Sequence, residues 1–172
     1  VVDSSGNPAV EVTRTVDVVD TTAPDITLEG ANPQTIEGGD PYVELGAPAS
    51  DNVDGDLAGA SGIDATAVNT AALGSYTVTY NVTDSSGNPA VEVTRTVDVV
   101  DTSLPVITLV GADPVVVEVG SPYVDAGATA WDAIDGDLTG SIVTVDPVNT
   151  SALGTYVVTY NVTDSSGNPA LQ

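Results

Sequence analysis

The fold is decided by residues 75–101, which read SYTVTYNVTDSSGNPAVEVTRTVDVVD. From 76 to 83, tyrosine and valine alternate with threonine and asparagine, the period-two pattern of a strand with one buried face. Residues 84–89, DSSGNP, are typical of a turn, and the Val- and Thr-rich residues 90–100 predict a returning strand. The stretch therefore predicts an antiparallel hairpin.

The hairpin sequence recurs along the chain. The block DSSGNPAVEVTRTVDVVD occupies positions 3–20 and 84–101, and it begins again at Asp164. This spacing gives a tandem repeat of about 80 residues, the size of one small β domain. We therefore expect residues 1–20 to carry the last strand of a preceding repeat. Residues 21–101 then form a complete domain, and residues 102–172 a domain without its final strand.

Each repeat is predicted to be a β-sandwich. In the complete repeat, short strands are expected at 26–28, 34–37, 42–49 and 61–68, and a single helical turn at 69–73. Short strands punctuated by turns indicate tandem all-β, immunoglobulin-like sandwiches, in which the hairpin of residues 75–100 supplies strands F and G. Tyr76 stands at the position of a tyrosine corner, with an ordinary core tyrosine as the alternative, and Val78 takes the place of the second immunoglobulin cysteine.

Composition narrows the possible functions. There are 25 acidic residues against 2 basic ones, so the surface repels nucleic acid and anionic membranes and neither is an expected partner. Cysteine and histidine are absent, which excludes thiol and imidazole catalysis and the usual zinc sites. Small sandwiches seldom have the cleft that paired carboxylates need for glycoside chemistry, so an enzyme is not expected. A saline or calcium-rich exterior suits such a charge.

Acidic loops are the candidate site. In a sandwich of this kind the B–C and F–G loops lie at one end, and the linker from the preceding domain reaches that same end. Three stretches should therefore converge in each repeat, offering the hard oxygen ligands that calcium prefers. The predicted calcium ligands are Asp20, Asp51, Asp54, Asp56 and Asp84 for the first junction, and Asp101, Asp132, Asp135, Asp137 and Asp164 for the second. Aspartates that only stabilise turns are the alternative.

Other residues allow further interpretations. Trp131, beside the second acidic loop, either covers the junction or serves as an exposed binding residue. Arg14 and Arg95 share a face with valines, which favours a structural pairing over a functional role. Residues 9–19 could complete the sandwich of 103–170 in another molecule, giving head-to-tail filaments by strand addition. Chain boundaries that simply omit the last strand are the alternative to strand exchange.

A family resemblance agrees with this interpretation. The segments DTTAPDITLEG, YVELGAPASDNVDGDL and LGSYTVTYNVTDSSGNPA, with their counterparts DTSLPVITLVG, YVDAGATAWDAIDGDL and LGTYVVTYNVTDSSGNPA, recur in order. They resemble the tandem immunoglobulin-like repeats of bacterial surface proteins, the group related to hyaline-repeat domains. The acidic linker, B–C and F–G loops are also similar to the calcium-binding positions of cadherin repeats, although the spacings differ.

The resemblance implies an extracellular role. Such domains serve as spacers or stalks in secreted or surface-anchored proteins, often adhesins, and sometimes flank hydrolase domains. We therefore expect an extracellular bacterial spacer that contacts neighbouring repeats of its own chain and is stiffened by calcium. A carbohydrate- or partner-binding module and a strand-exchanged filament subunit are the alternatives.

Overall fold

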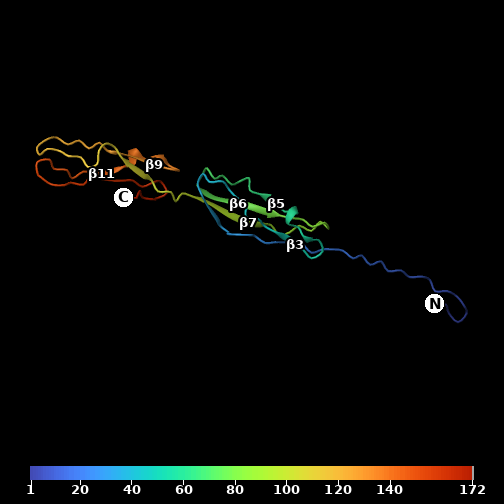
Figure 1. Ribbon diagram of the computed structural model, residues 1–172. Coiled ribbons are helices and arrows are strands. Elements are labelled where there is room, and N and C mark those ends of the chain that lie inside the picture. The colour runs from blue at the N-terminus through green and yellow to red at the C-terminus, as the bar shows by residue number, and fades with distance from the viewer. Residues whose placement is uncertain (172) are drawn as a thin grey trace. The chain divides into compact units, whose positions relative to one another are not determined.

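The computed structural model describes residues 1–171, and the regular secondary structure in that range is almost wholly β-strand (Figure 1). Helical structure in that range is confined to two 3-10 helices, and no helix there is long and apolar enough to cross a membrane. The predicted all-β fold is confirmed. The elements are β1 Asp25–Ile26, β2 Gln34–Glu37, β3 Ala49–Asp51, β4 Gly55–Asp56, η1 Ala58–Ala60, β5 Gly62–Asp64, β6 Gly74–Asn81, β7 Val93–Val100, β8 Val106–Leu109, β9 Ala128–Asp132, β10 Gly136–Asp137, η2 Thr139–Ser141, β11 Val143–Val145 and β12 Thr159–Asn161.

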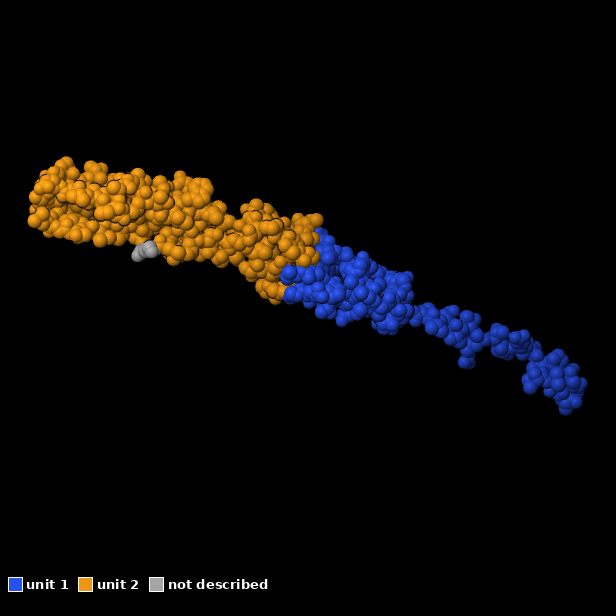
Figure 2. Space-filling view, viewed as in Figure 1, with its two compact units in different colours: residues 1–30, 45–64, 79–94 blue, residues 31–44, 65–78, 95–172 orange. Residues whose placement is uncertain are grey.

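The chain divides into two compact units, which Figure 2 colours separately. The first comprises residues 1–30, 45–64 and 79–94, and the second residues 31–44, 65–78 and 95–172. The first holds β1, β3, β4, η1 and β5, and the second holds β2, η2 and β8 to β12. Strands β6 and β7 run through both units, so this division does not follow the sequence repeats.

The hairpin of β6 and β7 forms the centre of a four-stranded sheet with the order β2-β7-β6-β5. Strand β2 pairs in parallel with β7, and β5 pairs antiparallel with β6. Along β6 the alternation predicted from sequence is observed, because Val78 and Tyr80 are buried whereas Thr77 and Asn81 are exposed. The buried face excludes apolar side chains from water, the main favourable term in folding.

The tyrosine corner predicted at the start of strand F is present. The Tyr76 hydroxyl donates to the Ala72 carbonyl at 2.8 Å, and the Tyr156 hydroxyl donates to the Ala152 carbonyl at 3.3 Å in the second repeat. Each tyrosine thus fixes the backbone four residues upstream. The corner determines how the chain enters the F strand.

The smaller sheets carry the acidic loops. In the first repeat β1, β3 and β4 form one antiparallel sheet, and β8, β9 and β10 form its counterpart in the second repeat. Strands β11 and β12 pair antiparallel. The tight β3–β4 and β9–β10 connections contain the B–C aspartates, so the register of these sheets positions the candidate ligands.

Four local expectations need correction. Residues 69–73 form a hydrogen-bonded turn that does not continue into a helix, with the Asn69 side chain accepting the Ala71 amide and the Asn69 carbonyl accepting the Ala72 amide. Only the end of the expected strand 42–49 is regular, as β3. The 3-10 helices η1 and η2 were not expected. Residues 9–19 are exposed and without regular structure.

Candidate metal centre

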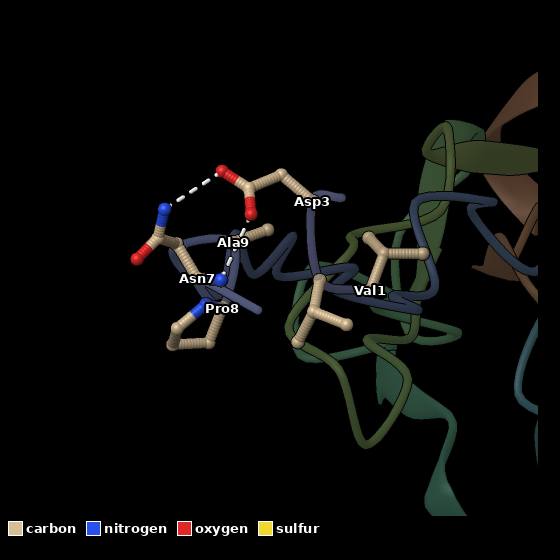
Figure 3. A pocket seen from close by; sticks show the side chains of 6 residues that line it. Val1, Asp3, Asn7, Pro8 and Ala9 are labelled. Carbon is tan, nitrogen blue, oxygen red and sulfur yellow. Dashed lines mark hydrogen bonds between the residues drawn. The ribbon is translucent and has the colours of Figure 1, made fainter. Parts of the chain in front are cut away.

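The F–G turn is held by its own hydrogen bonds. Asp84 Oδ1 accepts from the Asn88 backbone amide at 2.7 Å, and the Asn88 side-chain amide donates to Asp84 Oδ2 at 2.8 Å. The same pair of bonds joins Asp164 to Asn168, and Asp3 to Asn7 (Figure 3). The turn at residues 3–7 forms although those residues are exposed, so its shape is encoded locally. Asp84 therefore does cap its turn.

The B–C loop lies against the F–G turn. Asp51 Oδ1 accepts the backbone amides of Val53 at 2.7 Å and Asp54 at 3.0 Å, which closes a tight turn. Asp54 then binds the other loop, where its two carboxylate oxygens accept the Ser85 amide at 2.6 Å and hydroxyl at 2.7 Å. The two loops are thus adjacent, as the sandwich topology predicted.

The linker brings the third carboxylate. Asp20 Oδ1 accepts the Thr22 amide at 3.0 Å, and the Asp20 carbonyl accepts from the Asn88 side chain at 3.4 Å. Asp20, Asp51 and Asp84 each offer an oxygen, and these three oxygens lie within 4.8 Å of one another. Linker, B–C loop and F–G turn therefore meet in one acidic cluster, here called the first cluster.

The second repeat contains a similar second cluster, in which the B–C carboxylate is Asp135, the equivalent of Asp54 and not of Asp51. Asp101, Asp135 and Asp164 offer oxygens within 4.8 Å of one another, and the Asn168 side chain donates to the Asp101 carbonyl at 3.1 Å. Asp135 binds the Ser165 amide at 2.6 Å and hydroxyl at 2.8 Å. Asp132 is 1% exposed and closes the loop in the way that Asp51 does.

Four carboxylate oxygens in or beside the two clusters are buried without a hydrogen-bond partner. They are Oδ2 of Asp20 and Asp51 in the first cluster, Oδ2 of Asp101 in the second, and Oδ2 of Asp132, whose charge lies near Asp101. In each of these residues the other oxygen caps a local turn, which leaves one oxygen directed inward. Buried polar atoms are normally paired, and an unpaired one indicates a water or an ion. The same pattern in both repeats fits a bound cation.

The pKa shifts in the second cluster also fit a bound cation. Burial raises the pKa of Asp101, against hydrogen bonds from Ser166 and Ser103, and the nearby charges of Asp132 and Asp164 raise it further. Burial also opposes ionisation of Asp164, but hydrogen bonds from Asn168 hold its pKa below the usual value. The cluster thus gathers carboxylates whose mutual repulsion a cation would remove.

The remaining predicted ligands have local roles. Asp56 accepts the Ala58 amide at 2.9 Å, and Asp137 accepts the Thr139 amide at 2.9 Å, so each caps the start of a 3-10 helix. Sequence reasoning did not assign a role to Ser85 and Ser165, which join the two loops. Their recurrence at the same place in each DSSGNP turn of the chain was the available signal.

Trp131 and Arg95 have contrasting surroundings. Trp131 lies on β9, paired with Val106 and Asp137, and is 62% exposed. Arg95 is fully buried on β7, and its guanidinium donates to the Ala31 carbonyl at 2.7 Å. Arg14, its sequence equivalent, is exposed.

Comparison with known families completes the description. The family of the Ig-like domain of bacterial surface proteins matches at residues 26–99 and again at 107–171. The chain belongs to this family. Both matches fall on the repeats predicted from sequence, and the resemblance to bacterial surface repeats is confirmed. Membership identifies the chain as an Ig-like module of a surface protein. It also suggests a location outside the cell or on its surface, and a structural role without catalysis.

Three curated relatives are similar over most of the chain. Pesticidal crystal protein Cry22Aa of Bacillus thuringiensis is 35% identical over 81% of this chain and 18% of its own length. Hyalin of Strongylocentrotus purpuratus is 36% identical over 98% of this chain and 15% of its own length. Hyalin of Lytechinus variegatus is 35% identical over 98% of this chain and 33% of its own length. The chain thus spans at most a third of these relatives.

One solved structure is less similar. A lipoprotein of Bacteroides thetaiotaomicron aligns with a TM-score of 0.41 and 20% identity, over 86% of this chain and 76% of its own. A likeness at this level carries no argument about function.

Proposed function

We propose that this chain is part of an extracellular spacer in which calcium binds at the acidic cluster of each repeat and restrains the linker. The observation that carries the proposal is the convergence of linker, B–C and F–G carboxylates within 4.8 Å in both repeats. Each cluster includes one linker aspartate, Asp20 or Asp101, so an ion bound there ties the linker to the domain that follows it.

The chemistry of the clusters favours calcium. Calcium accepts six to eight oxygen ligands in flexible geometry, whereas magnesium needs a tight octahedron and keeps its waters. The residues present supply only carboxylate and carbonyl oxygens, and waters complete the shell. Asp20, Asp51, Asp54 and Asp84 hold the ion in the first repeat, with Asp101, Asp132, Asp135 and Asp164 in the second.

Calorimetric titration tests the binding. Calcium added to the EDTA-treated chain should bind at two sites, one for each repeat. The Asp51→Asn variant should retain one site, because the amide keeps the turn but loses the charge. Asp56→Asn is the matched control, since it removes the same charge from the same loop at a residue that caps η1. The absence of calcium binding, or an equal loss in both variants, would overturn the assignment.

The proposed restraint of the linker by calcium needs a separate measurement. Small-angle scattering with calcium should show a narrower distribution of lengths than scattering in EDTA, and Asp101→Asn should abolish the difference. If calcium binds with unchanged scattering, the ion stabilises each repeat by itself and the spacer mechanism is wrong.

The exposure of Trp131 supports a second candidate function, that of a module that binds a carbohydrate or a protein partner. Its 62% exposure beside the acidic loop leaves an aromatic surface available for stacking. Because the chain has one tryptophan, its fluorescence reports directly on this surface. Saturable quenching by an oligosaccharide, lost in Trp131→Ala, would establish the binding module. No quenching across a panel of surface glycans would reject carbohydrate binding at this residue.

A further inference from the structure

The outer face of the β8-β9-β10 sheet carries a row of three exposed side chains. Trp131 of β9 pairs with Val106 of β8 on one side and with Asp137 of β10 on the other. Side chains of directly paired residues point to the same face of a sheet, with Cβ atoms about 5 Å apart. Val106 is 65% exposed, Trp131 is 62% exposed, and Asp137 is exposed as well. These three residues are here called the tryptophan row.

The indole has a defined place on this face. A Cβ added at Gly136 would lie 3.8 Å from an indole carbon of Trp131, so the ring reaches the start of β10. Asp137 is fixed beside it, because Asp137 Oδ1 accepts the Thr139 amide at 2.9 Å. The row therefore presents an aliphatic side chain, then an aromatic ring, and then a carboxylate.

The first repeat has a different row at the equivalent place. Asp25 pairs with Ser50, and Ser50 pairs with Asp56, and all three are exposed. The surrounding sequence is the same in both repeats, since the first position of the row is followed by ITL and the third lies within GDL. The two repeats thus differ at outward positions of one sheet while the rest of its local sequence is shared.

This difference does not serve the stability of the sheet. The first repeat forms the corresponding sheet, β1-β3-β4, with Asp25 and Ser50 in place of Val106 and Trp131. An indole that keeps most of its surface in water contributes little through burial. A large aromatic side chain beside an exposed valine indicates a contact surface, because tryptophan is usually well buried in a folded domain.

Charge determines which partner fits this surface. The chain has 25 acidic residues against 2 basic ones, so it repels anionic partners and attracts cationic ones. A lysine or arginine side chain matches the row from end to end. Its methylene stem packs on Val106, its cation lies over the face of Trp131, and its charge-assisted hydrogen bond goes to Asp137.

We propose that the tryptophan row is a docking surface for a basic segment of another protein, rich in lysine or arginine. This inference rests on the second candidate function, whose partner it names, and it is independent of the calcium sites. Asp137 is not one of the three carboxylates that form the second cluster. Calcium in excess should therefore leave the docking in place.

Nuclear magnetic resonance titration of the complete chain tests the docking. A short peptide of alternating lysine and serine should shift the Trp131 indole signal and the amides of β8 and β9 saturably at physiological salt. The same peptide with glutamine in place of lysine should not. Trp131→Ala should raise Kd about fivefold, and Asp137→Asn about threefold. Asp56→Asn is the matched control and should leave Kd unchanged, since Asp56 caps η1 as Asp137 caps η2 but pairs with Ser50.

A gain of binding in the first repeat is the second test. The double variant Asp25→Val with Ser50→Trp rebuilds the row beside Asp56. Both positions face outward, so the variant should keep the fold. It should bind two lysine peptides per chain instead of one, with the new shifts on β1 and β3.

The outcomes separate this inference from the function on which it rests. An equal Kd in Asp137→Asn and Asp56→Asn, shifts spread evenly over all acidic loops, loss of binding in calcium, or one peptide per double variant would each overturn the basic partner. If oligosaccharides shift the Trp131 indole signal and the lysine peptide does not, the second candidate function stands and the basic partner is wrong. If neither ligand shifts it, both are wrong.

Discussion

The Asp51→Asn variant should be more stable than the parent chain in EDTA and less stable than the parent chain in calcium. The amide oxygen still accepts the Val53 and Asp54 backbone amides, so the turn is retained. What disappears is one negative charge whose second oxygen is buried and unpaired. The variant therefore separates the metal-binding role of Asp51 from its structural role.

The structure gives the expected magnitudes. In EDTA, charges on Asp20 and Asp51 at 4.8 Å repel by about 3 kcal/mol at an effective dielectric constant of about 20, and by less in salt. If salt screening leaves about 1 kcal/mol of this repulsion, Asp51→Asn should melt about 4–8 °C above the parent in EDTA. With calcium at about 100 times Kd, the parent repeat gains about 2.7 kcal/mol, or about 10–20 °C, and the variant gains nothing.

Calorimetry with and without calcium measures these shifts, and hydrogen exchange assigns them to a repeat. Asp51→Asn should remove the calcium response from β6 and leave that of β12 unchanged, whereas Asp132→Asn should do the reverse. A full calcium response of β6 in Asp51→Asn would refute the role of this carboxylate. A lower melting temperature of the variant in EDTA would refute the repulsion argument.

Three further outcomes follow from the geometry. The raised pKa of Asp101 means that its ionised form destabilises the metal-free fold near neutrality. Stability in EDTA should therefore rise, in Asp101-dependent fashion, as pH falls through that raised pKa towards the ordinary value of 3.8, while stability in calcium falls over the same range; parallel slopes in pH-dependent melting would contradict this. Arg95→Ala should cost about 3–5 kcal/mol in denaturant unfolding, because it leaves a cavity and an unpaired carbonyl, whereas Arg14→Ala should cost almost nothing because Arg14 is exposed. Tyr76→Phe should lose about 1 kcal/mol with its corner hydrogen bond, and an unchanged unfolding midpoint would show that packing alone fixes the corner.

Sequence predicted the fold where side chains alternate or where a turn has its own chemistry. The buried face of β6 and the tyrosine corner were visible in residues 75–84, and the DSSGNP turn forms from its own Asp and Asn. The strand expected at 42–49 was less predictable, because its regularity depends on partners elsewhere in the chain. At 69–73 the expected helical turn is a single hydrogen-bonded turn, held by the Asn69 side chain at the Ala71 amide and not continued into a helix.

For the candidate site, topology was the useful part of the sequence argument. It predicted that linker, B–C and F–G loops would meet, and Asp20, Asp51 and Asp84 do meet. It did not distinguish the aspartates that keep one oxygen free for an ion from those whose oxygens accept only local backbone amides. Asp56 has the same chemistry as Asp51, yet its position at the start of η1 gives it a capping role, and that helix was not predicted.

Glu37, at the end of β2, has a consequence for the linker. Its carboxylate accepts the amides and hydroxyls of Thr102 and Ser103, and these bonds, those of Thr102 foremost, lower the pKa of Glu37 to about 2. These hydrogen bonds form without an ion, and they persist in mild acid because the Glu37 carboxylate stays ionised there. Asp101, the residue before Thr102, is held instead by the contacts of the second cluster. If calcium binds at the second cluster as proposed, chelation would free Asp101 while Glu37 still holds residues 102 and 103, so the linker would gain only part of its possible freedom of movement.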